Sequence, residues 1–246
     1  MMILTAILFC GSFQTQAQHL GTKVYFSAKE MPDLIKYLPP PPDTIGMEFA
    51  YDIMRYEWGK TQRCDSVRAA IARRDAKLTF KALFAEFSVP FGLKISKKST
   101  PEIYKLLVNS VSTIDQTRVK PKVYYKRKRP FVHFHEHMLT TSEEIFLSCE
   151  GSYPSGHGMR GYAVALLLSE INPANADTIM ARGYMYGESR VIVGAHWQSD
   201  VDASRLGAAI GVIHLHTSEA FMEQLSKAQA EFKQLTTDPE ETIKKE

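Results

Sequence analysis

Apolar residues recur at intervals of three and four along most of the chain, which is the spacing of one face of an α-helix. A Thr-Pro-Glu sequence, typical of a helix N-terminus, opens one such segment at Thr100. The apolar positions that follow it are Ile103, Leu106, Leu107, Val111 and Ile114. On the same pattern we expect helices over about residues 49–58, 63–75, 78–87, 159–170, 174–188 and 198–233.

Few segments alternate between apolar and polar residues in the manner of a β-strand. The proline run at residues 39–42 predicts an extended segment, because proline cannot continue a helix. No internal repeat or interdomain linker interrupts the pattern, and a polar tail begins at about residue 236. The sequence therefore predicts a single all-α domain, a compact helical bundle over residues 18–246.

Residues 1–17 have the pattern of a secretory signal peptide. An uncharged, largely apolar run covers residues 1–10, and Thr15 and Ala17 stand where small residues precede a cleavage site. No Lys or Arg precedes the run, and a buried N-terminal strand is the alternative. The longest later apolar run, residues 163–168, is far too short to span a bilayer. We therefore expect a periplasmic or secreted protein without a membrane partner.

Composition and charge narrow the choice of partners. Of the 246 residues, 44% are hydrophobic and 23% are charged, and the net charge is +3. These values fit an ordinary globular protein rather than a nucleic-acid binder with its concentrated basic face. Cys64 and Cys149 could form a disulfide in an oxidising compartment, although the sequence alone does not predict that they meet.

Lys122 and Arg129 are the first candidate site residues. They stand seven positions apart in the sequence KVYYKRKRP, so both can project from one face of a helix with their backbones ~10 Å apart. Two long cationic side chains could close around a small dianion, arginine by bidentate contact and lysine as a point charge. The alternative is a solvated basic surface, which we favour for Lys126, Arg127 and Lys128.

The second candidate stretch is YPSGHG, Tyr153 to Gly158, directly before an apolar helical run. Its Pro-Ser-Gly sequence predicts a turn, and the free N–H groups of the following helix N-terminus suit an anion. Ser155 can donate its hydroxyl, Gly156 lets the backbone approach closely, and His157 stands at the rim. Alternatively, Ser155 only caps the helix and His157 is a surface residue.

The third stretch is SRVIVGAHWQSD, Ser189 to Asp200, where an apolar segment carries an arginine, a histidine and a carboxylate. His196 and Asp200 are four positions apart, so in a helical segment the carboxylate reaches the imidazole. An Asp that accepts from Nδ1–H leaves Nε2 with a free lone pair, as a base or nucleophile needs. Arg190 adds a cation upstream. The alternative is a buried His–Asp hydrogen bond that holds two helices together.

Together the three stretches supply what phosphoryl transfer requires. Lys122, Arg129 and Arg190 are cations for the phosphoryl oxygens. Ser155 and a helix N-terminus are neutral donors, and the two histidines are an acid and a nucleophile. This combination favours the functional interpretation of each stretch over its structural alternative.

Three further histidines alternate in the sequence FVHFHEH and would lie on one side of an extended strand: His133, His135 and His137. Three histidines can bind zinc, but no HExxH motif or cysteine partner accompanies them. We therefore favour a solvent-facing loop and expect no metal and no cofactor.

The ordered set K-x6-RP (residues 122–130), PSGH (residues 154–157) and SR-x5-H-x3-D (residues 189–200) resembles a known signature. It is the phosphatase signature of the type 2 phosphatidic-acid-phosphatase superfamily, which vanadium-dependent haloperoxidases share. LPPPPD near residue 40, SEINPANADTIMARGYMYGESR and HWQSDVDASR are also similar to secreted class A bacterial non-specific acid phosphatases. The resemblance covers about residues 38–216.

The resemblance implies an all-helical, metal-free hydrolase of phosphate monoesters, which is often a homodimer. It implies that His196 is the nucleophile, that Asp200 orients it, and that His157 protonates the leaving group and then activates water. The residues that it assigns to phosphate binding are Lys122, Arg129, Ser155, Gly156 and Arg190. Gly158 departs from the family's usual Thr or Ser, and the segments around Cys149 and the three histidines match poorly.

Other functions remain open within and beyond this resemblance. A vanadate-dependent haloperoxidase is the main alternative, because vanadate mimics the phosphate transition state; a nucleotide diphosphohydrolase or phosphotransferase of the same fold is another. A lipid phosphatase is disfavoured by the lack of spanning segments, and a phosphate-binding protein by the intact His157, His196 and Asp200. The first reaction step needs His196 neutral and His157 protonated, so we expect an acidic-to-neutral optimum.

Overall fold

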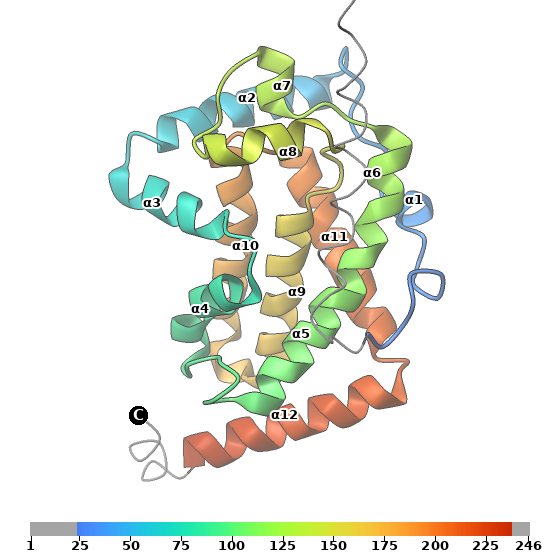
Figure 1. The fold of residues 1–246 in the computed structure, drawn as a ribbon, viewed down its shortest axis with the longest axis vertical. Helices are drawn as coiled ribbons and strands as arrows, with labels where there is room; N and C mark the ends of the chain where they lie inside the picture. The colour runs from blue at the N-terminus through green and yellow to red at the C-terminus, as the bar shows by residue number, and fades with distance from the viewer. Residues whose placement is uncertain (1–23, 238–246) are drawn as a thin grey trace, which may run out of the picture.

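The computed structural model describes residues 24–237, and the expected signal peptide lies outside this range. The described residues form helices and connecting segments with no strand, which confirms the all-α class (Figure 1). Between residues 24 and 237 the 3-10 turns are η2 (Gln116–Arg118), η3 (Thr141–Glu143) and η4 (Pro173–Asn175). The helices are α1 (Leu34–Tyr37), α2 (Met47–Gln62), α3 (Ser66–Asp75), α4 (Phe80–Phe91), α5 (Pro101–Asp115), α6 (Val119–Tyr125), α7 (Pro130–Phe134), α8 (Glu144–Ser148), α9 (Gly156–Ile171), α10 (Ala176–Ile192), α11 (Gln198–Leu215) and α12 (Glu219–Thr237).

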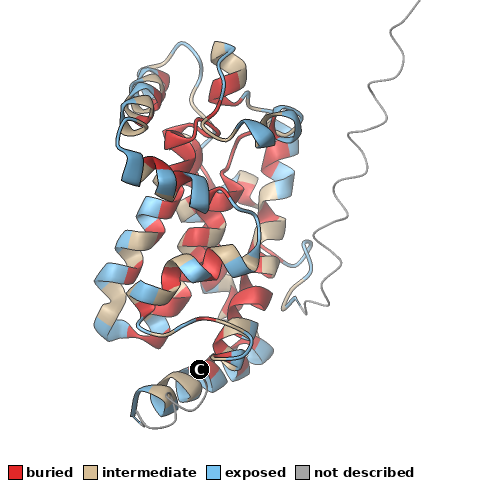
Figure 2. Cartoon of the chain, turned by 60° about the vertical axis from the view of Figure 1, so that its left-hand side comes forward, coloured by how far each residue is buried: buried red, intermediate tan, exposed pale blue. Residues whose placement is uncertain are grey.

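Helix α9 is the centre of the bundle. It packs against α10, α11 and α5 along its length and also contacts α4 and α12 (Figure 1). Most of its side chains are buried, as expected for a helix that is apolar on all sides. Figure 2 shows buried residues along the inner faces of the long helices and exposed residues on their outer faces.

Small residues let α9 and α10 approach closely. A Cβ atom on Gly183 of α10 would lie 2.5 Å from Cβ of Ala165 on α9. On the other side of the contact, a Cβ atom on Gly161 would lie 2.4 Å from Cδ1 of Tyr186. Both distances are far below van der Waals contact, so this helix pair requires glycine at both positions.

The sequence pattern predicted one helix over residues 198–233, and this prediction is wrong in one respect. Helix α11 ends at Leu215, and α12 begins at Glu219. The Oγ atom of Ser218 accepts from the backbone N of Phe221 at 3.3 Å and so caps the new helix. The apolar spacing continues across this break, which is why the pattern alone did not reveal it. Helix α12 also extends to Thr237, slightly beyond the expected start of the tail.

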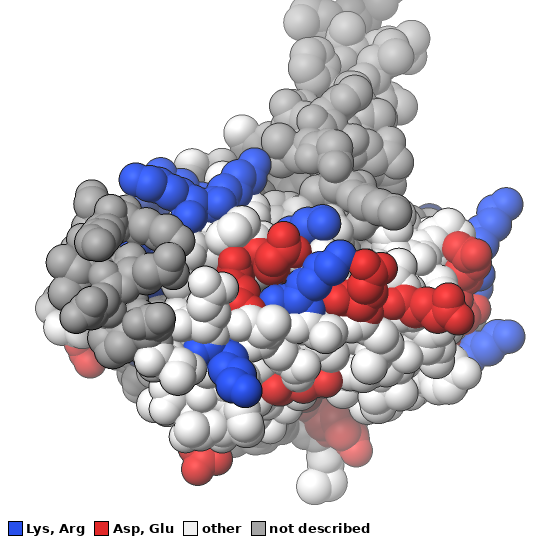
Figure 3. Space-filling view, turned by 90° about the horizontal axis from the view of Figure 1, so that it is seen from below, with Lys and Arg blue, Asp and Glu red and all other residues white. Residues whose placement is uncertain are grey.

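Helix α12 crosses the end of the bundle opposite α2, α7 and α8 (Figure 1). The carboxylate of Glu231 on α12 accepts from the backbone N atoms of Glu102 and Ile103, at 3.2 and 2.9 Å, and thereby caps α5. The space-filling view of this end shows acidic and basic side chains interspersed rather than a patch of one sign (Figure 3).

The three long helices that carry the signature meet at the other end. Helices α9 and α11 begin there and α10 ends there, and α2, α7 and α8 lie across it (Figure 1). No helix within residues 24–237 combines the length and the hydropathy that a membrane span needs.

We predict that Gly183→Val destabilises the protein, because the added side chain overlaps Ala165 in the α9–α10 contact. Overpacking of this kind costs about 1–3 kcal/mol of the free energy of unfolding. Urea unfolding followed by circular dichroism measures the loss. Ala181→Val is the matched control, because Ala181 lies on the exposed side of the same helix. Equal losses in the two variants would contradict the packing argument.

Candidate active site

Lys122 and Arg129 converge on one point, although they do not share a helix face as the sequence predicted. Helix α6 ends at Tyr125, Lys126 has a left-handed backbone with φ 45°, and Arg129 is extended. The chain therefore turns between the two cations. Nζ of Lys122 donates to the carbonyl of Gly151 at 2.5 Å, and a guanidinium nitrogen of Arg129 lies 3.2 Å from Oε2 of Glu150.

Arg129 is held in place by backbone carbonyls, and only 1% of it is exposed. Its Nε donates to the carbonyl of Leu147 at 2.8 Å, and one NH group donates to that of Ala195 at 3.0 Å. The same NH group lies 3.0 Å from Nε2 of His196. Burial lowers the pKa of Arg129 to about 10, so the group remains a cation.

The hydrogen bonds of His196 fix its tautomer. Arginine can only donate, so Nε2 of His196 must accept from Arg129, and Nδ1 carries the proton. Nδ1 then donates to Oδ2 of Asp200 at 3.3 Å, as the spacing predicted. The residue is not within a helix, however: α11 begins at Gln198, and Trp197 is its N-cap. Burial, followed by the charges of Arg129, Lys122 and Arg190, holds the pKa of His196 well below its usual value.

Arg127 is a functional residue that the sequence interpretation missed. We expected it on a solvated basic surface, but the structure places it between two fully buried carboxylates. One NH group donates to Oδ1 of Asp200 at 2.6 Å, and the other donates to Oδ2 of Asp52 at 2.6 Å. The guanidinium also lies over the ring of Trp197. Arg127 therefore supports the carboxylate that orients His196, whereas Lys126 and Lys128 are exposed as expected.

Asp52 of α2 was also missed. It accepts from the backbone N and the hydroxyl of Ser199, at 2.8 and 2.6 Å, in addition to Arg127. Its position carried a signal, because it lies three residues after Phe49 and four before Tyr56 on the buried side of a predicted helix. A carboxylate on such a face needs a charged partner.

The second stretch forms the N-terminus of α9. Ser155 is the N-cap, and its Oγ accepts from the backbone N of Gly158 at 3.1 Å. Its own backbone N donates to the carbonyl of Asp200 at 3.0 Å, which ties the starts of α9 and α11 together. The Tyr153–Pro154 peptide bond before it is cis. Ser155 therefore caps α9, and its hydroxyl hydrogen is still available to a ligand.

His157 is buried, so the surface interpretation of this residue is wrong. Its Nε2 lies 3.1 Å from the carbonyl of Ala76, which can only accept, so Nε2 carries a proton. Nδ1 remains free to gain or lose one. Burial is the main cause that holds the pKa of His157 well below its usual value, and the charges of Arg190, Arg160 and His196 add to it.

Gly156 and Gly158 are tightly enclosed. A Cβ atom on Gly156 would lie 2.9 Å from Cδ of Arg118, so this arginine packs against the turn of the second stretch. A Cβ atom on Gly158 would lie 2.3 Å from Oγ of Ser204 on α11. The hydroxyl of Ser204 thus stands where a side chain at position 158 would begin, which explains the departure from Thr or Ser.

Arg190 lies at the end of α10 and is fully buried. Its carbonyl accepts from the backbone N atoms of Ala195 and His196, at 3.0 and 3.2 Å, through a turn in which Gly194 has φ 87°. Its guanidinium nitrogens have no hydrogen-bond partner among the described residues. The nearest anion is Glu143, whose Oε2 lies 3.5 Å away. Burial lowers the pKa of Arg190.

We call Lys122, Arg129 and Arg190 the cationic cradle. After burial, the charges of all three lower the pKa of His196. Arg129 lies 3.0 Å from Nε2 of His196, and it shares the carboxylate of Glu150 with Lys122. A buried guanidinium with unused donors beside an oriented imidazole suits a tetrahedral oxyanion. The cradle, the N-terminus of α9 and two buried histidines together have the composition of a phosphoryl-transfer site.

Behind the cradle, Asp75 secures helix α3. It accepts from the hydroxyl of Ser189 at 2.6 Å and pairs with Arg182, and a second hydrogen bond joins Arg68 to Ser189. Ala76, the residue after Asp75, provides the carbonyl that holds His157. Asp75 therefore fixes the position of that carbonyl. The sequence offered no sign of this role, since α3 has little apolar patterning.

The expected solvent-facing loop is confirmed for His135 and His137 but is wrong for His133. His133 lies in α7 and packs against the rings of Phe49 and Trp197, whereas His135 and His137 are exposed. Among residues 24–237, no group of three His, Cys, Asp or Glu side chains is placed to hold a metal. Cys64 and Cys149 are both exposed and are not bonded to each other.

Comparison of the sequence with known proteins identifies the family of this chain. A model of the PAP2 superfamily matches residues 104–223, a range that contains all eight candidate site residues. A non-specific acid phosphatase of Providencia stuartii is 43% identical over 212 residues, which cover 86% of this chain and 85% of that protein. The chain belongs to the bacterial non-specific acid phosphatases of the PAP2 superfamily.

Two further relatives of this acid phosphatase family support the assignment. A non-specific acid phosphatase of Salmonella typhimurium strain LT2 is 40% identical over 196 residues, covering 79% of this chain and 78% of that protein. An acid phosphatase of Zymomonas mobilis is 32% identical over 205 residues, covering 83% and 77%. Acid phosphatase activity is therefore the function that the comparisons support.

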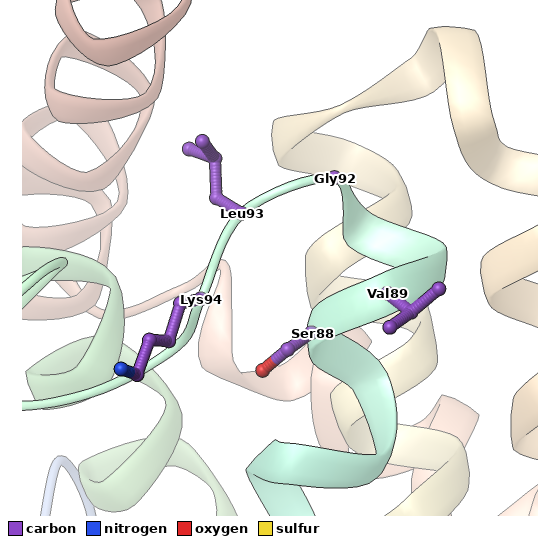
Figure 4. A pocket seen from close by; sticks show the side chains of 5 residues that line it. All are labelled: Ser88, Val89, Gly92, Leu93 and Lys94. Carbon is purple, nitrogen blue, oxygen red and sulfur yellow. The ribbon is translucent and has the colours of Figure 1, made fainter. Parts of the chain in front are cut away.

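The described residues of this acid phosphatase relative form surface hollows that are not lined by the cradle. One, of about 300 Å³, is at the C-terminal end of α4 and is lined by Ser88, Val89, Gly92, Leu93 and Lys94 (Figure 4). The other, of about 500 Å³, lies between the proline run and α2 and includes Ser199 and Asp202. Neither hollow is lined by a cation or histidine of the signature.

The depressed pKa of His157 predicts that acid destabilises the fold. In the unfolded chain this histidine takes up a proton below about pH 6.5, whereas burial opposes protonation in the folded state. Its contribution to stability is therefore present above that pH and is lost as the pH falls. Between about pH 7.5 and 5.5 the loss is up to about 1.4 kcal/mol.

We expect His157→Gln to reduce this loss, measured as the free energy of unfolding in urea at the two pH values. His135→Asn is the control for replacing an exposed imidazole outside the site, and it should keep the pH dependence of the wild type. An unchanged pH dependence in His157→Gln would show that burial does not oppose protonation of His157.

Proposed function

We propose that this protein hydrolyses phosphate monoesters through a phosphohistidine formed on His196. The observation that carries the proposal is the orientation of His196: Nδ1 faces Asp200, and Nε2 faces the cationic cradle. An imidazole held in this way directs its lone pair at the place where an anion would bind.

Binding places the phosphate among the three cations. The unused donors of Arg190, together with Arg129 and Lys122, contact its oxygens, and the N-terminus of α9 and the hydroxyl of Ser155 add neutral donors. A phosphate oxygen then takes over the NH group of Arg129 that lies 3.0 Å from Nε2 of His196. This exchange frees the lone pair for attack.

The first step is an in-line displacement. The Nε2–P bond forms while the bond from phosphorus to the ester oxygen breaks, and the bonding pair leaves with that oxygen. His157 gives its Nδ1 proton to the departing alkoxide. Asp200 stabilises the positive charge that develops on His196, and Arg127 keeps the carboxylate in position.

The second step reverses the proton transfer. The now neutral His157 accepts a proton from water at Nδ1, and the water oxygen attacks phosphorus as the P–Nε2 bond breaks. Inorganic phosphate then leaves, and His196 is again neutral. The cradle consists of cations, so it suits an anion and needs no metal to hold the phosphate; we propose a metal-independent reaction without a cofactor.

The pH dependence follows from the two histidines. Burial keeps His196 neutral at mildly acidic pH, as a nucleophile requires. Burial also keeps His157 deprotonated until the pH is well below its usual value, so its acid form is scarce at neutral pH in the free protein. The bound phosphate dianion opposes this effect. His196 stays neutral at mildly acidic pH, and His157 loses its acid form as the pH rises. Both effects favour activity at acidic pH and its decline at higher pH.

The remaining parts of the proposal rest on the sequence and the resemblance. A broad range of monoesters is proposed because the family relatives are named non-specific. Export to the periplasm or the medium is proposed from the pattern of residues 1–17. A homodimer is proposed on the resemblance alone.

We expect His196→Ala to abolish hydrolysis of 4-nitrophenyl phosphate, since the phosphohistidine can no longer form. The measurement is release of 4-nitrophenolate by the wild type and the variant, each with and without EDTA. His137→Ala is the control for loss of an imidazole and should keep full activity. Full activity of His196→Ala would overturn the nucleophile assignment, and loss of wild-type activity in EDTA would overturn metal independence.

We expect His157→Asn to slow phenyl phosphate more than 4-nitrophenyl phosphate. Phenolate is the poorer leaving group and depends more on a general acid, which contributes about 10²–10⁴-fold. The measurement is kcat/KM for both esters, because this ratio reports the steps up to the phosphohistidine. Equal losses for the two esters would contradict the assignment of His157 as the acid.

A further inference from the structure

The cationic cradle contains a carboxylate for which the proposed phosphatase reaction has no use. Glu150 lies between α8 and α9, just before the second stretch. Its Oε2 is 3.2 Å from a guanidinium nitrogen of Arg129 and 3.5 Å from Nζ of Lys122. These are two of the three cations to which a phosphate group would bind. The carboxylate therefore occupies donors that the substrate needs.

A third cation holds Glu150 from the outer side. Oε1 of Glu150 accepts from Arg118 at 2.9 Å, and Arg118 is itself anchored to Asp115 at 2.8 Å. Burial alone would raise the pKa of Glu150, but Lys122, Arg118 and Arg129 outweigh burial and lower it. Glu150 is thus an anion at mildly acidic pH, such as pH about 5.5.

Exposure distinguishes Glu150 from its partners. Lys122 and Arg129 have 4% and 1% of their side chains exposed, whereas 33% of Glu150 is exposed. The cations are enclosed and also bound to the carbonyls of Gly151 and Leu147. The carboxylate stands at the outer edge and can rotate toward water, so an incoming anion would displace Glu150 and leave the cations in place.

We propose that Glu150 is an internal competitor of phosphate. Its carboxylate leaves Lys122 and Arg129 when the phosphate group of the substrate binds to them, and it returns when the product dissociates. This inference rests on the proposed function, since it assumes that phosphate binds in the cradle. Glu150 thereby lowers the affinity for substrate and product alike. Its benefit is turnover, because a buried site with three uncompensated cations would retain inorganic phosphate.

Glu143 has a comparable position at the other side of the cradle. Its Oε2 lies 3.5 Å from Arg190, but it also accepts from the hydroxyl of Thr140 at 2.8 Å. Both carboxylates belong to the segment that joins α7 to α9. That segment therefore places one carboxylate beside Arg190 and another beside Lys122 and Arg129. Glu150 makes the closer contact, at 3.2 Å to Arg129.

Glu150→Gln tests the inference, because the amide keeps the size and an acceptor oxygen but removes the charge. We expect the dissociation constant for inorganic phosphate to fall about tenfold, which corresponds to about 1.4 kcal/mol. The constant for product inhibition should fall in parallel. Isothermal titration calorimetry with inorganic phosphate at about pH 5.5 measures the affinity; Lys122, whose pKa burial lowers to about 7, is charged there.

Glu170→Gln is the matched control. Its side chain is equally exposed, at 33%, and pairs with His216 near the far end of α9. The variant makes the same change in net charge more than about 20 Å along the helix from the cradle. If both variants tighten phosphate binding equally, net charge explains the effect and the inference is wrong. Glu150→Asn serves as a second variant if Glu150→Gln does not fold.

The outcomes separate this inference from the proposed function. Tighter phosphate binding by Glu150→Gln alone supports the competitor role, whether or not the wild type hydrolyses esters. Unchanged or weaker binding overturns that role, even if hydrolysis and its dependence on His196 are as proposed. Absence of hydrolysis in a wild type that binds phosphate would overturn the function and leave the competitor role intact.

Discussion

The structure depends on the burial of positive charge at one end of a helical bundle. Arg129 and Arg190 are almost fully enclosed. Carbonyl oxygens of Leu147 and Ala195 accept from Arg129, whereas Arg190 has only the carboxylate of Glu143 3.5 Å away among the described residues. Removing such groups from water is expensive unless partners are in place. The turns around residues 147–151 and 190–196 provide those partners, so the loops at this end have little freedom to vary. The donors left unused on Arg190 are what an anion can exploit.

Much of the architecture could be predicted from the sequence because the long helices have distinct apolar faces and clear starts. Helix α5 begins at its Thr-Pro-Glu sequence, and α9 follows its Pro-Ser-Gly turn. The break between α11 and α12 could not be seen, because the apolar spacing runs through it and only Ser218 marks the new start. The turn after α6 was missed for a related reason. The spacing of Lys122 and Arg129 fits a helix, whereas tertiary contacts with Glu150 and Gly151 favour a left-handed residue at position 126.

The candidate site was predictable where chemistry demands particular residue types, and not where support comes from elsewhere in the chain. His196 and Asp200 are close in sequence, so their contact follows from spacing. Arg127 and Asp52 are 75 positions apart, and their pairing appears only when α2 folds across the site. Arg127 also stands between Lys126 and Lys128, which do face water, so the sequence did not distinguish it from a surface cation.

The turn between Arg190 and His196 has a consequence for how such a protein can diversify. Two amide groups bonded to the carbonyl of Arg190, with Gly194 in the left-handed region, make Arg190 and His196 a single rigid unit. That unit cannot be retuned for a new ester without disturbing the reaction centre itself. Selectivity would therefore be acquired at the periphery, at exposed side chains such as His135, His137, Ile145 and Phe146, rather than in the turn at residues 147–151. Substrate recognition can therefore change in such a fold while the residues of the site stay the same.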